Sequence, residues 1–116
     1  MVVEAILSDN KNRGIRLLDD VYDPIDDDEY RIAVRIGHGY YEWNEVVDYH
    51  FMREDKNGNW SHKPSTMPIQ YLEEGETPDD VSWDLYIETA VGYRVAIKGF
   101  YNPETTRYFA IKYPSN

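Results

Sequence analysis

The sequence contains no cysteine among its 116 residues. This absence excludes a disulfide framework, a zinc-thiolate site and a cysteine nucleophile within the chain. No apolar run approaches the length of a membrane-spanning helix, and the N-terminal sequence MVVEAILSDNKNR lacks the basic start, long apolar centre and small-residue cleavage site of a signal peptide. We therefore expect a cytoplasmic protein that makes no membrane contact.

Basic residues are scarce in this sequence. There are 12 Lys and Arg against 22 Asp and Glu, which gives a formal net charge of −10. Such a charge repels nucleic acid phosphates and anionic lipids and favours basic partners. We therefore expect no direct binding to nucleic acid, and we expect the partner to present a basic protein surface.

The composition predicts a single domain over residues 1–116. The apolar fraction is 41% and the aromatic fraction is 15%, so the chain can bury a core, and its 11 tyrosines supply amphipathic rings for the surface. The fold class that we expect is α+β, with a central antiparallel β-sheet of about five or six strands and a short N-terminal helix. No motif indicates a cofactor, and we expect none.

Hydrophobic spacing and turn residues predict the order of the elements. A helix near Val2 ends at Asn12-Arg13-Gly14. Two segments are compatible with two structures each. Residues 40–47 form either a loop or the lead-in to a hairpin, and residues 82–91 form either a strand or a helical turn. The expected strands span residues 15–18, 30–36 (ended by Gly37-His38-Gly39), 69–72, 93–101 and 106–113, with residues 102–105 joining the last two as a hairpin.

Two acidic segments should form exposed loops. Residues 19–29 hold seven carboxylates, and residues 73–80, EEGETPDD, hold the second group. Calcium binding is the alternative for the first segment, although it lacks the Gly and terminal Glu of a calcium loop. Carboxylates beside aromatic rings suit a basic or planar partner. The candidate binding residues are Asp26, Asp27, Asp28, Glu29, Trp43, Trp60, Glu73 and Glu74.

Residues 48–64, DYHFMREDKNGNWSHKP, predict a β-hairpin that carries two of the three histidines. The turn decides how the two histidines are placed. One alternative is a three-residue loop at residues 56–58, with the glycine in the left-handed conformation. The residue numbers of each cross-strand pair then add up to 114.

In that register Met52 faces His62, and His50 faces Pro64. Both imidazoles then project from one face as diagonal neighbours, within reach of each other through their side chains. The other alternative is a two-residue loop at residues 57–58, which places the histidines on opposite faces of the sheet.

This hairpin resembles a family of bacterial proteins that carry DYH-F/W-x-R followed by DG-x-W-SHKP, and the preceding YRIAVRI resembles their lead-in strand. Ser65 stands where that family has a glycine after SHKP. The proteins are similar to papain-like (NlpC/P60-like) cysteine hydrolases, in which an upstream helix bears the nucleophilic cysteine. The resemblance implies that His50 matches the base histidine and that His62 matches the polar residue that orients it.

The chain departs from that family because it has no cysteine. The imidazole of a Cys-His pair acts by generating a thiolate, and no serine of this chain lies in a recognisable nucleophile setting. We therefore expect the implied chemistry to be lost, or to be completed by another chain. His50 and His62 are then vestigial catalytic residues that hold the hairpin. A metal site formed by His50, His62 and Asp48 is a further alternative.

The leading functional hypothesis is a non-catalytic protein-binding or inhibitor-type domain on a papain-like scaffold. Its small size and acidic charge would suit a phage or mobile-element antidefence factor that competes with nucleic acid for a basic groove. The alternative hypothesis is an enzyme. It would be half of a split hydrolase, or a metal-assisted hydrolase that uses His50 and His62.

Overall fold

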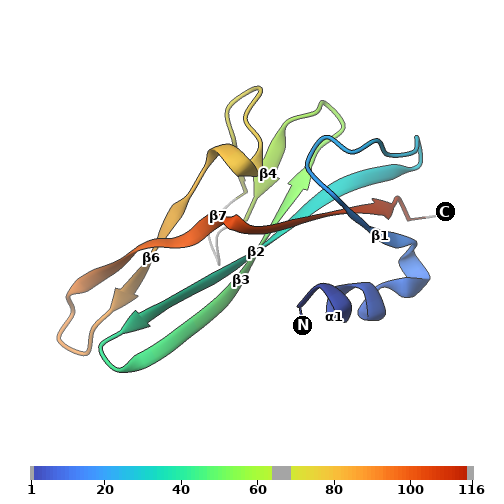
Figure 1. The fold of residues 1–116 in the computed structure, drawn as a ribbon. Coiled ribbons are helices and arrows are strands. Elements are labelled where there is room, and N and C mark those ends of the chain that lie inside the picture. Colours follow the sequence, from blue (N-terminus) through green and yellow to red (C-terminus); the bar gives the residue numbers. More distant parts are fainter. Residues whose placement is uncertain (1, 64–68, 115–116) are drawn as a thin grey trace.

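The computed structural model describes residues 2–63 and 69–114. Within these residues the chain forms one short α-helix and a seven-stranded antiparallel sheet (Figure 1). The expected α+β class is confirmed, with one strand more than expected. The elements are α1 (Val2–Asp9), the 3-10 turn η1 (Lys11–Arg13), β1 (Ile15–Leu18), β2 (Glu29–Tyr41), β3 (Asn44–Glu54), β4 (Trp60–His62), β5 (Gln70–Tyr71), the 3-10 turn η2 (Pro78–Asp80), β6 (Trp83–Glu88) and β7 (Arg94–Lys112).

The strands lie in the order β1-β7-β2-β3-β4-β5, and β6 pairs with the N-terminal part of β7. Outside the central region, β2 with β3 and β6 with β7 project as two hairpin arms, seen at the lower left of Figure 1. The arms make the molecule elongated, with extents of 50 × 31 × 27 Å. Both ends of the described chain lie near the opposite end, beside β1 (Figure 1).

The predicted N-terminal helix forms, although α1 ends at Asp9 and only the 3-10 turn η1 reaches the predicted stop. Helix α1 gives way to η1, and Gly14 then adopts a left-handed φ of 65°, which glycine tolerates because it has no Cβ. Strand β1 follows directly over the predicted residues. The predicted strand at 69–72 is also confirmed, although β5 is limited to Gln70–Tyr71.

Strand β2 is longer than predicted, because Gly37-His38-Gly39 does not end it. Neither glycine has a positive φ, and both continue the pairing with β3. Their role is steric. A Cβ on Gly37 would lie 2.1 Å from Phe100 Cε1, and one on Gly39 would lie 2.8 Å from Ile97 Cγ2. The missing side chains therefore let the β6–β7 arm pack directly onto the β2–β3 arm.

The predicted C-terminal hairpin is wrong, since residues 94–112 form one strand. Residues 102–105 are a bulge within it, and the pairing with β2 shifts between Arg35↔Thr106 and Gly37↔Tyr101. The Thr105 hydroxyl donates a hydrogen bond to the Ile36 carbonyl at 2.6 Å, which ties the bulge to β2. Strand β7 instead forms a hairpin with β6. Of the two alternatives for residues 82–91, the strand is therefore the one that forms, and the η2 turn precedes it.

One face of the sheet carries the main core. Ala33 of β2, Met52 of β3 and Ala110 of β7 are each at most 2% exposed there. Val21 from the first acidic segment and Leu72, directly before the second, pack into the same cluster, which is completed by Leu18, Trp60 and Tyr108. Each acidic segment is therefore anchored on this face by an apolar residue.

Candidate functional site

The hairpin formed by β3 and β4 has the first of the two predicted registers. Its pairs are Met52↔His62, Arg53↔Ser61 and Glu54↔Trp60. The loop at residues 56–58 is closed by a hydrogen bond of 2.7 Å from the Asp55 amide to the Asn59 carbonyl, and its glycine has a φ of 87°. The predicted partner of His50, Pro64, lies outside the described residues.

This register brings the two histidines together. His50 Nε2 lies 2.7 Å from His62 Nδ1, and the ring centroids are 4.8 Å apart in an edge-to-face arrangement. His62 is buried and His50 is half-buried. A hydrogen bond between two ring nitrogens needs one donor and one acceptor, so at least one ring is neutral.

Aromatic rings enclose the pair. Trp83 of β6 lies 5.2 Å from the His50 ring and 4.7 Å from the His62 ring, and Tyr101 of β7 lies 5.4 Å from His50. Burial, followed by the charges of His62 and Arg35, lowers the pKa of His50 to about 4. Burial and Arg35 also lower the pKa of His62. Both rings are therefore neutral near pH 7.

Arg35 is the buried cation beside the pair. Its side chain is fully buried, and its Cζ lies 5.1 Å from the centroid of the Trp83 ring. It donates hydrogen bonds to Thr106 Oγ1 and to the Val81 carbonyl, each at 2.7 Å, and to the Pro78 carbonyl. Burial lowers the pKa of this guanidinium. Arg35 thus ties β2 to the segment that leads into β6.

The two histidines border an open groove of about 800 Å³ between β3 and β6. Asp48 also lines this groove, on the same face of β3 as His50, but its Oδ2 accepts a hydrogen bond of 2.6 Å from the Tyr101 hydroxyl. Burial, followed by that bond, raises the pKa of Tyr101. In the part of the chain that the structure describes, no three His, Asp or Glu side chains gather as metal ligands.

The described surroundings of the pair are aromatic rings, a guanidinium and a carboxylate already bonded to a tyrosine. Within the described chain, the hydrogen bond of His50 Nε2 goes to His62 and not to a hydroxyl group. The metal alternative gains no third ligand from Asp48, and the calcium alternative gains no convergent set from residues 19–29 within the described chain. The arrangement is suited to holding β3, β4 and β6 together.

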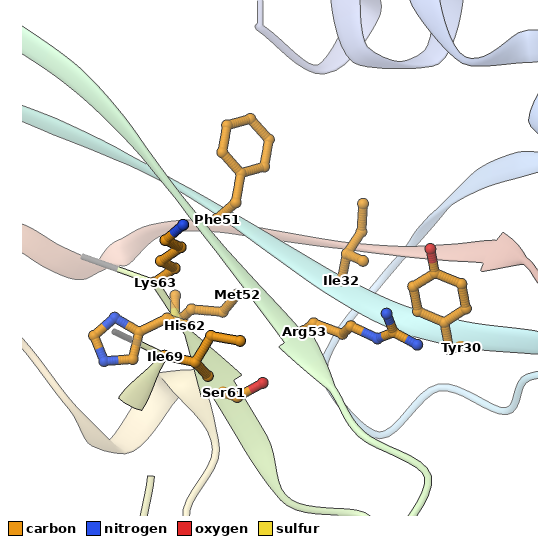
Figure 2. A pocket seen from close by; sticks show the side chains of 9 residues that line it. All are labelled: Tyr30, Ile32, Phe51, Met52, Arg53, Ser61, His62, Lys63 and Ile69. Atoms are coloured by element: carbon orange, nitrogen blue, oxygen red, sulfur yellow. The ribbon is translucent and has the colours of Figure 1, made fainter. Parts of the chain in front are cut away.

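A second, smaller hollow of about 270 Å³ lies next to His62 (Figure 2). Arg53 extends toward Tyr30 there, with its Cζ 4.5 Å from the ring centroid. Phe51 and Ile69 add exposed apolar surface at its rim, at 58% and 57% exposure. The hollow therefore offers apolar contacts and two cations, Lys63 and Arg53, of which Arg53 is already held by an aromatic ring.

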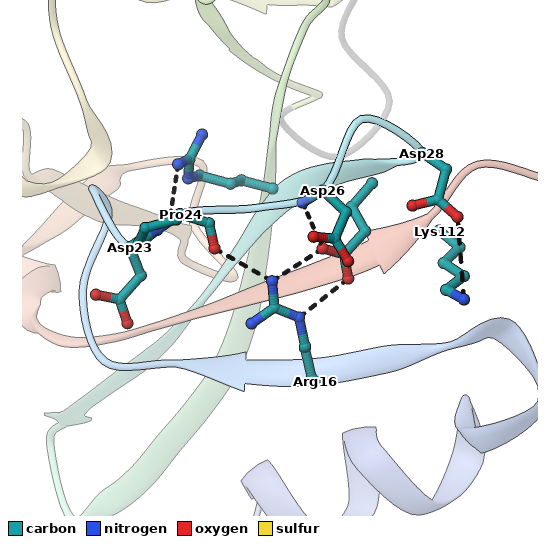
Figure 3. A network of polar contacts seen from close by, with 8 residues as sticks. Arg16, Asp23, Pro24, Asp26, Asp28 and Lys112 are labelled. Atoms are coloured by element: carbon teal, nitrogen blue, oxygen red, sulfur yellow. Dashed lines mark hydrogen bonds and ion pairs between the residues drawn. The ribbon is translucent and has the colours of Figure 1, made fainter.

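Glu29 does not belong to the exposed acidic surface, which corrects the expectation for this residue. It is buried at the start of β2, and Arg16 Nε and Nη2 donate to its carboxylate oxygens at 3.0 and 2.9 Å. The same Nη2 donates to the Pro24 carbonyl at 3.1 Å (Figure 3). The hydrogen bond from Arg16 lowers the pKa of Glu29. This carboxylate therefore holds the acidic loop in place through Arg16 and does not face a partner.

Trp60 is the second correction among the candidate binding residues. It is 1% exposed and lies in the core cluster, so it cannot contact a partner in this fold. Trp43, by contrast, is 96% exposed at the turn between β2 and β3. The remaining candidates are exposed acids, Asp26, Asp27, Asp28, Glu73 and Glu74.

The two acidic segments meet at one place on the surface. Val21 and Tyr22 of the first segment, and Gly75 and Glu76 of the second, line a common groove of about 230 Å³. The Asp26–Asp28 end of the first segment lies further along, where Asp28 faces Lys112 at 3.9 Å. The sequence does not predict this shared groove, because the two segments are far apart in the chain and are brought together only by the folding of both loops onto the core.

Among the residues that the structure describes, no helix has the length and apolar character needed to cross a membrane. Comparison with known proteins returns no matching family, no matching curated protein and no matching solved structure. The likeness of the central hairpin to papain-like hydrolases therefore stays a prediction.

Proposed function

We propose that this chain is a non-catalytic protein-binding domain that engages a basic surface of a partner through its two acidic segments. The observation that carries the proposal is the groove of about 230 Å³ that both segments border. Glu76 lines the groove, and Arg31, which also lines it, is paired with Glu54. Both segments carry further exposed carboxylates, and the formal net charge of the chain is −10. A surface of one sign steers an oppositely charged partner and fixes its orientation.

The state of the histidine pair supports a binding role over catalysis. His50 Nε2 and His62 Nδ1 are bonded to each other at 2.7 Å, and both rings have lowered pKa values. The absence of cysteine removes the nucleophile that this pair would activate and supports a location in the reducing cytoplasm. An inhibitor that competes with nucleic acid for a basic groove fits this combination of charge and size.

The test measures binding to protamine, a basic protein that itself binds DNA, by titration calorimetry at low and physiological salt. The variant combines Asp27→Asn, Glu73→Gln and Glu74→Gln. We expect affinity to fall about tenfold, because exposed ion pairs contribute about 0.5 kcal/mol each, and we expect the salt dependence to flatten. The intact chain should also displace DNA from protamine.

The matched control removes the same number of exposed charges elsewhere, with Glu42→Gln, Glu88→Gln and Glu104→Gln. These carboxylates lie on the hairpin arms and on the bulge of β7. The control should change affinity much less than the test variant. Equal losses in both variants, or an unchanged affinity at low salt in the test variant, would contradict the proposal.

A second candidate function is half of a split hydrolase, favoured by the groove of about 800 Å³ that His50 and His62 share. It predicts that a cysteine-bearing partner chain becomes active only when this chain is added. His50→Ala should then abolish the gained activity. The metal-assisted version predicts stoichiometric zinc in the purified protein, lost in the same variant.

A further inference from the structure

Strand β3 has an open edge along most of its length. Its pairing with β2 covers residues 44–53, whereas β4 pairs only with residues 52–54. Within the described residues, positions 44–51 therefore have a strand neighbour on one side only. Figure 1 shows β3 as the outer strand of the β2–β3 arm.

The hairpin register identifies which backbone groups face this edge. The Asp55 amide bonds to Asn59 across β4, and hydrogen-bonding direction alternates from residue to residue along an antiparallel strand. The odd-numbered residues of β3 therefore direct their N–H and C=O groups to the open side. They are Glu45, Val47, Tyr49 and Phe51, and the last three side chains are 48%, 47% and 58% exposed.

The two faces beside this edge differ in chemistry. Val47, Tyr49 and Phe51 form an apolar row on one face. On the opposite face, exposed Asp48 lines the groove of about 800 Å³, and Tyr49 and Phe51 reach the same groove from the apolar row. Trp83 also lines it but already packs against Arg35 and His62. The carboxylate of Asp48, which accepts one hydrogen bond from Tyr101, is therefore the group that attracts cations there. A strand added here would meet apolar side chains on one face and a carboxylate on the other.

We propose that residues 45–51 of β3 bind, by strand addition, an extended segment of a partner protein in which apolar and basic residues alternate. An exposed strand edge with unpaired backbone groups is a template for such pairing. A second copy of this chain is the disfavoured occupant, because each copy carries a formal charge of −10. This surface is separate from the acidic segments, so either proposal can fail alone.

The test uses an eight-residue peptide of alternating Val and Lys, with a control peptide of the same composition arranged as one block of each. Binding is measured by titration calorimetry, and amide hydrogen exchange is followed by NMR. We expect saturable binding of the alternating peptide alone. The amides of Val47, Tyr49 and Phe51 should exchange rapidly in the free chain and become protected when it binds.

The matched pair of variants is Val47→Pro and Val47→Ala. Both lose the valine side chain, but proline also removes an N–H that points away from β2, so the β2–β3 ladder keeps its bonds. We expect about a tenfold loss of peptide affinity for Val47→Pro and a loss below about threefold for Val47→Ala. Circular dichroism checks that both variants fold.

Three results would overturn the proposal. Slow exchange of these amides in the free chain would mean that the edge is already covered. Equal binding of the two peptides would mean attraction by charge alone, and no saturable binding at millimolar peptide would mean that no site exists. The exchange measurement decides the first point on the unmodified chain, even if Val47→Pro fails to fold.

Discussion

His50 Nε2 lies 2.7 Å from His62 Nδ1, although 12 residues separate the two positions in the chain. The three-residue loop at 56–58 makes this contact, because it sets the pairs of β3 and β4 so that both rings share a face. The contact lies beside the buried cation Arg35 and has no anion bonded to it among the described residues. Protonating either ring is therefore costly.

We expect the free energy of unfolding to fall as pH drops from 6.5 to 4. The folded-state pKa of His50 is lowered from 6.5 to about 4, so in this window the unfolded chain binds more protons than the folded chain. Stability from this group is full above pH 6.5 and is lost toward pH 4, by roughly 2 kcal/mol after allowing for its partial exposure. Urea unfolding at several pH values measures it.

The variant His50→Phe keeps a ring against Trp83 and removes the titration. Its stability should therefore depend less on pH across this window than that of the parent chain. His38→Gln is the control, because His38 is exposed on the other face of β2. A parallel pH dependence for His50→Phe and the parent chain would show that the pair does not couple protonation to folding.

Arg35→Met should destabilise the fold by about 3 kcal/mol. The substitution leaves three hydrogen-bond acceptors without their donor, namely the Val81 carbonyl, the Pro78 carbonyl and the Thr106 hydroxyl. Denaturant unfolding measures the loss. Arg13→Met, at an exposed guanidinium with one 3.4 Å bond to Asn10, should cost less than about 0.5 kcal/mol. Similar losses of stability in both variants would contradict the conclusion that Arg35 holds β2 to the segment that leads into β6.

Gly37→Ala should cost about 2–3 kcal/mol, because its Cβ would meet Phe100 Cε1 at 2.1 Å. The cause can be isolated with a double-mutant cycle. In a Phe100→Leu background, the same substitution should cost at least about 1 kcal/mol less. Strict additivity in denaturant unfolding would mean that the loss at Gly37 arises from something other than the contact with Phe100.

Trp60 and Trp43 should behave as opposites. Trp60→Ala removes a core side chain that is 1% exposed and should cost about 3–5 kcal/mol. Trp43→Ala, at a side chain that is 96% exposed, should change stability by less than about 0.5 kcal/mol. Thermal unfolding compares the two. A large loss for Trp43→Ala would contradict its placement at an exposed turn.

Local signals in the sequence carried the predictions that are confirmed. The loop at 56–58, which is one of the two alternatives for the hairpin, the stop at Gly14 after η1 and the strand at residues 15–18 depend on neighbours a few residues apart. The same applies to the shared face of His50 and His62, since the turn alone decides their register.

The errors concern positions whose environment comes from distant parts of the chain. The sequence around Gly37 predicts the end of a strand, but the glycine is needed there because Phe100 packs against it. The sequence around Glu29 predicts an exposed loop carboxylate, but Arg16 binds it in the folded chain. Arg35 gave no local sign of its burial, because its three acceptors come from residues 78, 81 and 106. Single-sequence patterns do not contain these pairings.

The pairing of β1 with β7 has a consequence for the order of folding. Ile15 lies opposite Ile111, and the strand order places β7 between β1 and β2. The centre of the sheet therefore stays incomplete on the ribosome until residue 111 has emerged, while the β3–β4 hairpin can close early. Contacts of such long sequence separation slow folding. The nascent chain thus exposes the edge of β2 until β7 arrives.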